Sequence, residues 1–88
     1  MVFVVKLANE FGELLRRYRE AAGFSQERLA DLADLDRTFV SLLERGQRQP
    51  SLETVFRLCA ALKIRPHEFV REVERQIQIN LVDGKQPC

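Results

Sequence analysis

The sequence contains no tryptophan, a single histidine, and no pair of cysteines at metal-ligand spacing. Cys59 lies in an apolar stretch and Cys88 is the last residue, so the two cysteines form neither a zinc-binding nor a dithiol motif. His67 is too isolated to predict a histidine–carboxylate metal cluster or a catalytic constellation. We therefore expect no enzyme activity, no catalytic residue, no metal, no cofactor and no small-molecule ligand.

Long apolar runs are missing as well. The longest uncharged apolar run, residues 1–5, is far too short to span a bilayer, and Lys6 and Glu10 follow too early for a secretory signal peptide. The chain is 45% hydrophobic and 31% charged with only three prolines, which argues against disorder and against a fibrous repeat. We expect one domain over residues 1–88 that acts in the cytoplasm and does not associate with membranes.

A strong excess of positive charge is also absent. The 14 lysines and arginines are balanced by 13 acidic residues, so the formal net charge is only +1. A strongly basic chain would have indicated nucleic-acid binding directly. Any such interface must therefore be inferred from where individual charges lie.

Apolar residues recur at helical spacing through most of the chain, which predicts an all-α body. The predicted helices are residues 7–22, 25–33, 37–45 and 52–62, and a fifth that begins at Pro66. Leu52 and Val70 fall on the apolar arcs of the fourth and fifth helices. Glycine ends the first and third helices, at Gly23 and Gly46. The predicted N-cap residues are Ser25, Asp36 and Ser51.

The two ends of the chain allow two interpretations. Ile77, Ile79 and Leu81 occur at every second position, as in a strand, and the β-branched residues within 1–5 could pair with it. The alternative extends the fifth helix through Ile77 and leaves a frayed tail. An isolated two-stranded ribbon is marginal in water. Short terminal β-strands would therefore have to pack on the helices or on a second chain.

Two short helices joined by a tight turn occupy residues 25–45, an arrangement typical of a helix-turn-helix. Ala30 is small where the two helices approach, and Leu35 can fill the space under the turn. The second helix of such a unit lies in the DNA major groove. Its outward arc, about 140° wide at helical geometry, carries Arg37, Thr38, Ser41, Leu42 and Arg45. Guanidinium and hydroxyl groups can hydrogen-bond base edges, so this arc is the candidate base-reading face.

Further polar side chains flank this arc. Gln26 lies at the start of a helix, where free amides attract phosphate. Residues 45–49 contain no acid, so Arg45, Gln47 and Arg48 are further candidates for phosphate contacts. Phe39 lies at the margin of the buried arc. It either packs against the neighbouring helix or contacts a sugar or a thymine methyl group.

The runs SQERLA (25–30), LDRTFVS (35–41) and LERG (43–46) resemble the Cro/C1-type (XRE) helix-turn-helix family. Within that family, the run from LDRTFVS to PSL is most similar to restriction–modification controller proteins. The resemblance covers residues 11–73. It implies a five-helix, lambda-repressor-like domain that regulates transcription by binding a palindromic operator in double-stranded DNA as a homodimer.

The resemblance also implies roles for individual residues. Base-reading roles fall on Arg37, Thr38, Phe39 and Ser41, and phosphate contacts fall on Gln26, Arg45, Gln47 and Arg48. Arg19 and Glu44 match a pair that holds the fold together in the family. The resemblance therefore implies that the DNA-binding side of the domain is formed by the helix-turn-helix unit and the residues that follow it.

Four apolar residues on the fourth helix, in the next link and on the fifth helix exceed the obvious needs of a small core: Phe56, Ile64, Phe69 and Val73. We expect some of them to contact a second copy of the chain. The alternative is that all four belong to the core. Competing functions are an antitoxin-type or plain repressor and a helical protein–protein interaction module, and the Arg/Thr/Ser face disfavours the interaction module.

Overall fold

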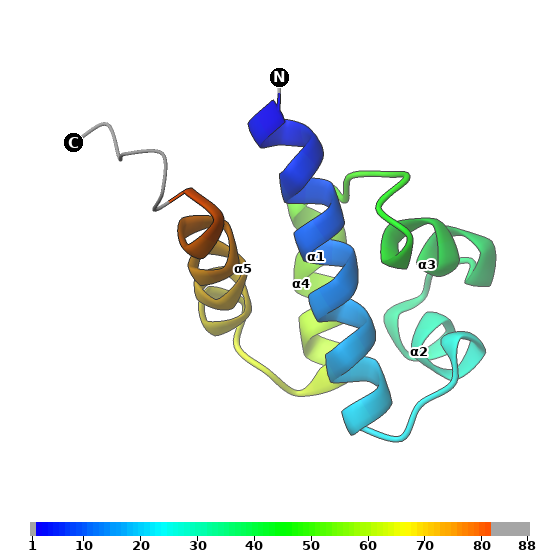
Figure 1. Ribbon diagram of the computed structural model, residues 1–88. Helices are drawn as coiled ribbons and strands as arrows, with labels where there is room; N and C mark the ends of the chain where they lie inside the picture. Colours follow the sequence, from blue (N-terminus) through cyan, green and yellow to red (C-terminus); the bar gives the residue numbers. More distant parts are fainter. Residues whose placement is uncertain (1, 82–88) are drawn as a thin grey trace.

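The computed structural model describes residues 2–81, which form a bundle of five helices (Figure 1). In chain order these are α1 (Val2–Ala21), α2 (Gln26–Ala33), α3 (Arg37–Glu44), α4 (Leu52–Leu62) and α5 (Pro66–Leu81). The long helix α1 packs against α3 and α5, while α2 packs against α3 and α4. In Figure 1, α2 and α3 lie on one side of α1 and α5 lies on the other. The predicted all-α fold is confirmed.

Both ends of the described chain are helical. Helix α1 begins at Val2, earlier than predicted, and α5 continues to Leu81. The strand interpretation is therefore wrong for residues 2–5 and 77–81, and the extension of the fifth helix through Ile77 is confirmed. The physical reason is that α5 packs along α1, which gives Ile77 a place in the helical core. Met1 and the tail 82–88 lie outside the described residues.

The core is centred on the contact between α1 and its neighbours. Its fully buried side chains come from all five helices: Leu15, Leu29, Val40, Leu43, Leu58, Cys59 and Phe69. The ring of Phe69 lies 5.3 Å from that of Phe11 at an interplanar angle of 71°, and 5.5 Å from that of Tyr18. Aromatic pairs of this kind contribute about 0.5–1.5 kcal/mol each beyond the burial itself. Phe69 therefore holds α5 against α1.

The helices begin largely as the sequence predicts. The Ser25 hydroxyl accepts a hydrogen bond from the Arg28 amide at 3.0 Å, and the Ser51 hydroxyl accepts one from the Thr54 amide at 3.1 Å. Asp36 has the extended backbone of an N-cap, but its side chain makes no capping hydrogen bond. The expectation that Asp36 caps α3 is therefore correct for the backbone and wrong for the carboxylate, which belongs to an exposed residue.

Four helices end at a residue in the left-handed backbone conformation. Glycine supplies it after α1 and α3, and Asp34 and Lys63 supply it after α2 and α4 with φ of 60° and 61°. The next amide then bonds back across the last turn, as Leu35 does to the Ala30 carbonyl at 2.8 Å. This tight reversal, with Leu35 packed against the core, sets the angle between α2 and α3.

The backbones of α1 and α3 approach each other closely at Gly12. A β-carbon at this buried position would lie 2.3 Å from the carbonyl oxygen of Leu43 and 2.7 Å from that of Glu44. Both neighbours are backbone atoms, which cannot turn aside as a flexible side chain can. Glycine at residue 12 therefore fixes the C-terminal end of α3 against α1.

We expect Gly12→Ala to destabilise the protein by about 1–3 kcal/mol, because overpacking forces backbone shifts. The free energy of unfolding in urea measures this effect. Glu13→Ala, at an exposed neighbouring residue of the same helix, is the control and should change stability by no more than about 0.5 kcal/mol. Equal stabilities of the two variants would contradict the close approach.

Candidate nucleic-acid interface

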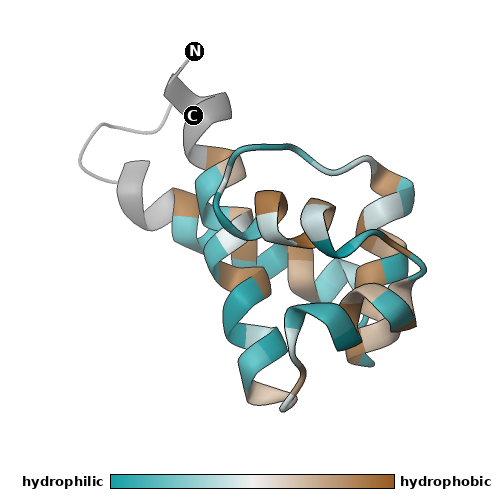
Figure 2. Ribbon diagram, turned by 90° about the vertical axis from the view of Figure 1, so that its right-hand side faces the viewer, coloured by the Kyte–Doolittle hydropathy of each residue, from teal (hydrophilic) through white to brown (hydrophobic). Residues whose placement is uncertain are grey.

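The outward side of α3 carries the side chains predicted for DNA reading. Arg37 and Thr38 in its first turn are exposed, and Ser41 and Leu42 one turn later are partly exposed. The inward side is anchored by Val40 and Leu43, which are fully buried. The predicted division of α3 into two faces is therefore present, and Figure 2 views the molecule from the side on which α2 and α3 lie.

Phe39 occupies the boundary between these two faces. It is half-buried and packs against the hydrophobic core, so one of the two sequence interpretations, packing within the domain, describes most of its surface. The part of the ring that remains accessible borders the polar face of α3. Phe39 can thus support the reading face while offering only limited apolar surface to a ligand.

The connector between α3 and α4, residues 45–51, extends the polar surface beyond the end of α3. Arg45, Gln47 and Arg48 are exposed, and the Arg45 Nε donates to the Ser41 carbonyl at 3.4 Å. This bond lays the Arg45 side chain along the last turn of α3. The connector is largely hydrophilic in Figure 2. The arginines that are candidates for phosphate contacts therefore lie directly after α3, next to its outward face.

A buried carboxylate joins three parts of the fold behind this surface. Glu44 accepts from Arg19 through both oxygens, with Nε–Oε2 at 2.5 Å and Nη2–Oε1 at 3.1 Å. The Arg19 Nη1 also donates to the Phe24 carbonyl at 2.9 Å. The side chains of Arg19 and Glu44 are only 11% and 3% exposed. The hydrogen bond and the charge of Glu44 raise the pKa of the Arg19 guanidinium above its ordinary value, although burial opposes the shift.

Gln26, the predicted phosphate contact on α2, joins the same network. Its Nε2 donates to Glu44 Oε1 at 2.9 Å, so this carboxylate oxygen accepts from both Arg19 and Gln26. The family resemblance implied the pairing of Arg19 with Glu44, but the sequence gave no signal for the bond of Gln26 to Glu44, because this contact joins α2 to the far end of α3. The consequence is that the side chain of the first residue of α2 is held from inside the fold.

The described residues offer little for acid–base, metal or thiol chemistry. No group of three or more His, Cys, Asp or Glu residues in this part of the chain is placed to hold a metal. Burial raises the pKa of Cys59 to about 11, so its thiol is protonated and weakly nucleophilic at neutral pH. Within residues 2–81, none of the helices combines the length and apolarity that crossing a membrane requires.

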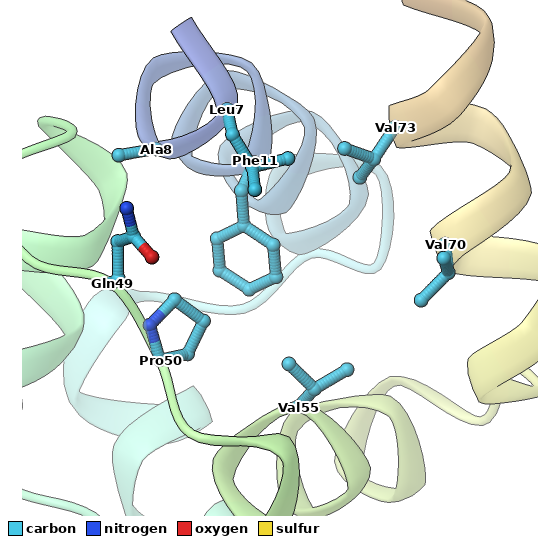
Figure 3. Close-up of a pocket in the computed structure, with 8 residues that line it drawn as sticks. All are labelled: Leu7, Ala8, Phe11, Gln49, Pro50, Val55, Val70 and Val73. Carbon is cyan, nitrogen blue, oxygen red and sulfur yellow. The ribbon is translucent and has the colours of Figure 1, made fainter. Parts of the chain in front are cut away.

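A cavity of about 220 Å³ lies between α1, α4 and α5, beside the connector (Figure 3). Its lining is mainly apolar and contains no ionisable side chain: Leu7, Ala8, Phe11, Gln49, Pro50, Val55, Val70 and Val73. Figure 3 shows Gln49 and Pro50 on one side of it and Val70 and Val73 on the other. The cavity is thus a packing gap next to the connector, without the groups that catalysis needs.

The structure divides the four residues predicted for a dimer interface. Phe69 and Val73 are buried within this chain, so their side chains have almost no surface for a partner. Phe56 is 54% exposed and Ile64 is partly exposed. Two large apolar residues that the sequence placed on buried arcs are exposed instead, Leu52 at 71% and Val70 at 49%. Leu52 is the first residue of α4, so no preceding helical turn lies beneath its side chain.

Comparison with known proteins agrees with this geometry. The model of the helix-turn-helix family matches residues 15–69. The control protein C.BamHI of Bacillus amyloliquefaciens is 38% identical over 61 residues, which are 68% of this chain and 75% of that protein. The crystal structure of the restriction–modification controller protein C.AhdI from Aeromonas hydrophila is 48% identical, with a TM-score of 0.69. That match covers 70% of this chain and 94% of the other.

A third similar structure includes DNA. It is the controller protein C.Esp1396I, a tetramer in complex with its natural 35 base-pair operator, at 25% identity and a TM-score of 0.74. The match covers 81% of this chain and 93% of that one. The helix-turn-helix family model, which matches residues 15–69, spans α3 and the connector that carry the exposed polar face described above.

Proposed function

Because this chain belongs to the Cro/C1-type helix-turn-helix family, we propose that it is a transcription regulator that binds a palindromic operator in double-stranded DNA as a homodimer. The observation that carries the proposal is the outward face of α3, which presents arginine and hydroxyl side chains. The acid of this helix, Glu44, is buried and paired with Arg19. Such a face suits base edges and phosphates, whereas an acidic or apolar face on α3 would have favoured a protein–protein interaction module.

The roles of individual side chains follow from their exposure and chemistry. Arg37 can present its guanidinium fork to the O6 and N7 atoms of guanine, and Thr38 and Ser41 can bond to base edges. Leu42 and the accessible edge of Phe39 suit the methyl group of thymine. The phosphate contacts, which set the position of the protein on the duplex, are assigned to Gln26, Arg45, Gln47 and Arg48.

The dimer is proposed to form through α4 and α5. Leu52 and Phe56 lie one helical turn apart on α4, and Val70 lies on the neighbouring helix α5, with Ile64 in the link between the two helices. Exposed apolar side chains of this size lose contact with water when a second copy covers them. A two-fold pair of domains reads two half-sites about one helical turn apart, which gives a palindromic operator.

The similarity to C.BamHI and C.AhdI favours control of restriction–modification genes over an antitoxin or a plain repressor. Such a regulator acts in the cytoplasm, where its operator lies. The family is one of DNA-binding regulators and is not a known enzyme family. A restriction enzyme or methyltransferase gene beside the gene for this chain would support this role, and a toxin gene would support the antitoxin.

Selection of bound duplexes from a random DNA pool at about 0.15 M salt tests the proposed function, because this salt concentration weakens non-specific binding. We expect enrichment of an inverted repeat with half-sites about one helical turn apart. A folded, dimeric protein that enriches no sequence would contradict operator binding and favour a protein–protein interaction module.

Once an operator is known, alanine substitutions of two arginines should affect DNA binding differently. Arg37→Ala should weaken binding to the operator by about 1–3 kcal/mol and relax the preference at one base position. Arg48→Ala should weaken binding to all duplexes similarly and lower the salt slope by about one. Titrations of matched and mismatched duplexes at several salt concentrations separate the two effects. A sequence-selective loss for Arg48→Ala would show that its assignment to phosphate is wrong.

We expect Phe56→Ala to weaken dimerisation by at least about tenfold, because the aromatic side chain no longer contributes its buried apolar surface. Sedimentation equilibrium measures the dimer dissociation constant. Leu32→Ala is the matched control, since Leu32 is also a large exposed apolar residue but lies on α2, outside the proposed interface. Equal dissociation constants for the two variants would place the interface elsewhere.

A further inference from the structure

We propose that Glu44 is a positioning residue for DNA binding, whose carboxylate holds the Gln26 amide ready for a DNA phosphate before the DNA arrives. The inference rests on the proposed function and adds a residue that does not itself touch DNA. Its basis is the hydrogen bond from Gln26 Nε2 to Glu44 Oε1 at 2.9 Å. Because an amide nitrogen carries two hydrogens, the second remains for an acceptor outside the fold.

The surroundings of Gln26 suit an anion. Gln26 is the first residue of α2, and the Ser25 hydroxyl is already bonded to the Arg28 amide at 3.0 Å. The backbone amides of Gln26 and Glu27 have no carbonyl within the helix to bond, because the first turn of any helix lacks such partners. A phosphate oxygen at this end of α2 would therefore find backbone donors beside the side-chain amide.

The buried carboxylate can hold Gln26 without repelling phosphate because Arg19 neutralises it. Both oxygens of Glu44 accept from the Arg19 guanidinium, so the pair carries no net charge. Arg19 is in turn held by the Phe24 carbonyl at 2.9 Å. The orientation of Gln26 is thus set by a chain of bonds that begins in α1, on atoms that are largely shielded from water.

Holding the amide in advance reduces the entropy lost on binding. Immobilising a flexible side chain at an interface costs about 0.5–1.5 kcal/mol, which corresponds to a factor of about 2–10 in affinity. Gln26→Ala should therefore weaken operator binding by about 2- to 10-fold in the wild-type chain. Much of this loss of affinity should disappear in a variant that lacks the Glu44 carboxylate to which the Gln26 amide is bonded.

The Glu44 carboxylate can be removed without leaving the charge of Arg19 buried and unpaired. The double substitution Arg19→Met/Glu44→Met replaces the ion pair with apolar side chains, a change that folded proteins often tolerate or gain stability from. We expect this double variant to bind the operator about 2- to 10-fold more weakly. In the background of this double variant, Gln26→Ala should weaken operator binding by less than about twofold. Gln47→Ala, which removes an amide not bonded to Glu44, is the control and should cost the same in both backgrounds.

Comparing Gln26→Ala in the two backgrounds forms a mutant cycle. The cycle distinguishes a role of Glu44 in positioning Gln26 from a role of Glu44 in the stability of the fold alone. If Gln26→Ala costs the same in both backgrounds, or nothing in the wild-type chain, the proposal is overturned. A wild-type chain that selects no operator would instead contradict the proposed function, since the cycle is measured only on a selected duplex.

A second measurement needs no substitution and decides the question if the double variant does not fold. In the wild-type protein without DNA, the side-chain NH₂ signals of Gln26 in an NMR spectrum should show restricted motion, unlike those of exposed Gln47. They should stay restricted when operator DNA is added. A Gln26 amide that is as mobile as that of Gln47 in the free protein would overturn the proposal.

Discussion

The arrangement of the DNA-binding unit depends on one buried carboxylate. Glu44 ends α3, and its two oxygens take hydrogen bonds from α1 through Arg19 and from α2 through Gln26. A buried charge left without a partner costs several kcal/mol, and the bidentate pair with Arg19 prevents that cost at Glu44. No buried side-chain nitrogen or oxygen in the described residues lacks a partner. The angle between α2 and α3 is therefore held by charge as well as by packing.

The remaining packing serves to present α3 as a rigid surface. Val40 and Leu43 fix its inward side, and Gly12 lets the backbone of α1 touch its last turn. Because the backbones at this contact cannot approach more closely without a clash, the contact fixes the position of the α3 backbone against α1. A short helix with such support can read DNA with little rearrangement, which preserves affinity.

The surfaces proposed for DNA and for a second copy lie on different elements. The polar face belongs to α3 and the connector, whereas the exposed apolar residues Leu52, Phe56 and Val70 belong to α4 and α5. The core between them includes Phe69, whose contacts with Phe11 and Tyr18 hold α5 on α1. A dimer formed through α4 and α5 would therefore fix the spacing of two reading helices without covering either of them.

The sequence by itself determined the features that depend on neighbouring residues in the chain. Serine caps, the glycines after α1 and α3, and the two faces of α3 were predictable, because each depends on residues within a turn or two. The helical ends, the burial of Phe69 and the exposure of Val70 were decided by tertiary structure. Phe69 and Val70 are adjacent apolar residues of α5, so it is the packing of α5 against α1 that decides that the first is buried and the second exposed. The bond between Gln26 and Glu44 likewise exists because the fold brings α2 to the end of α3.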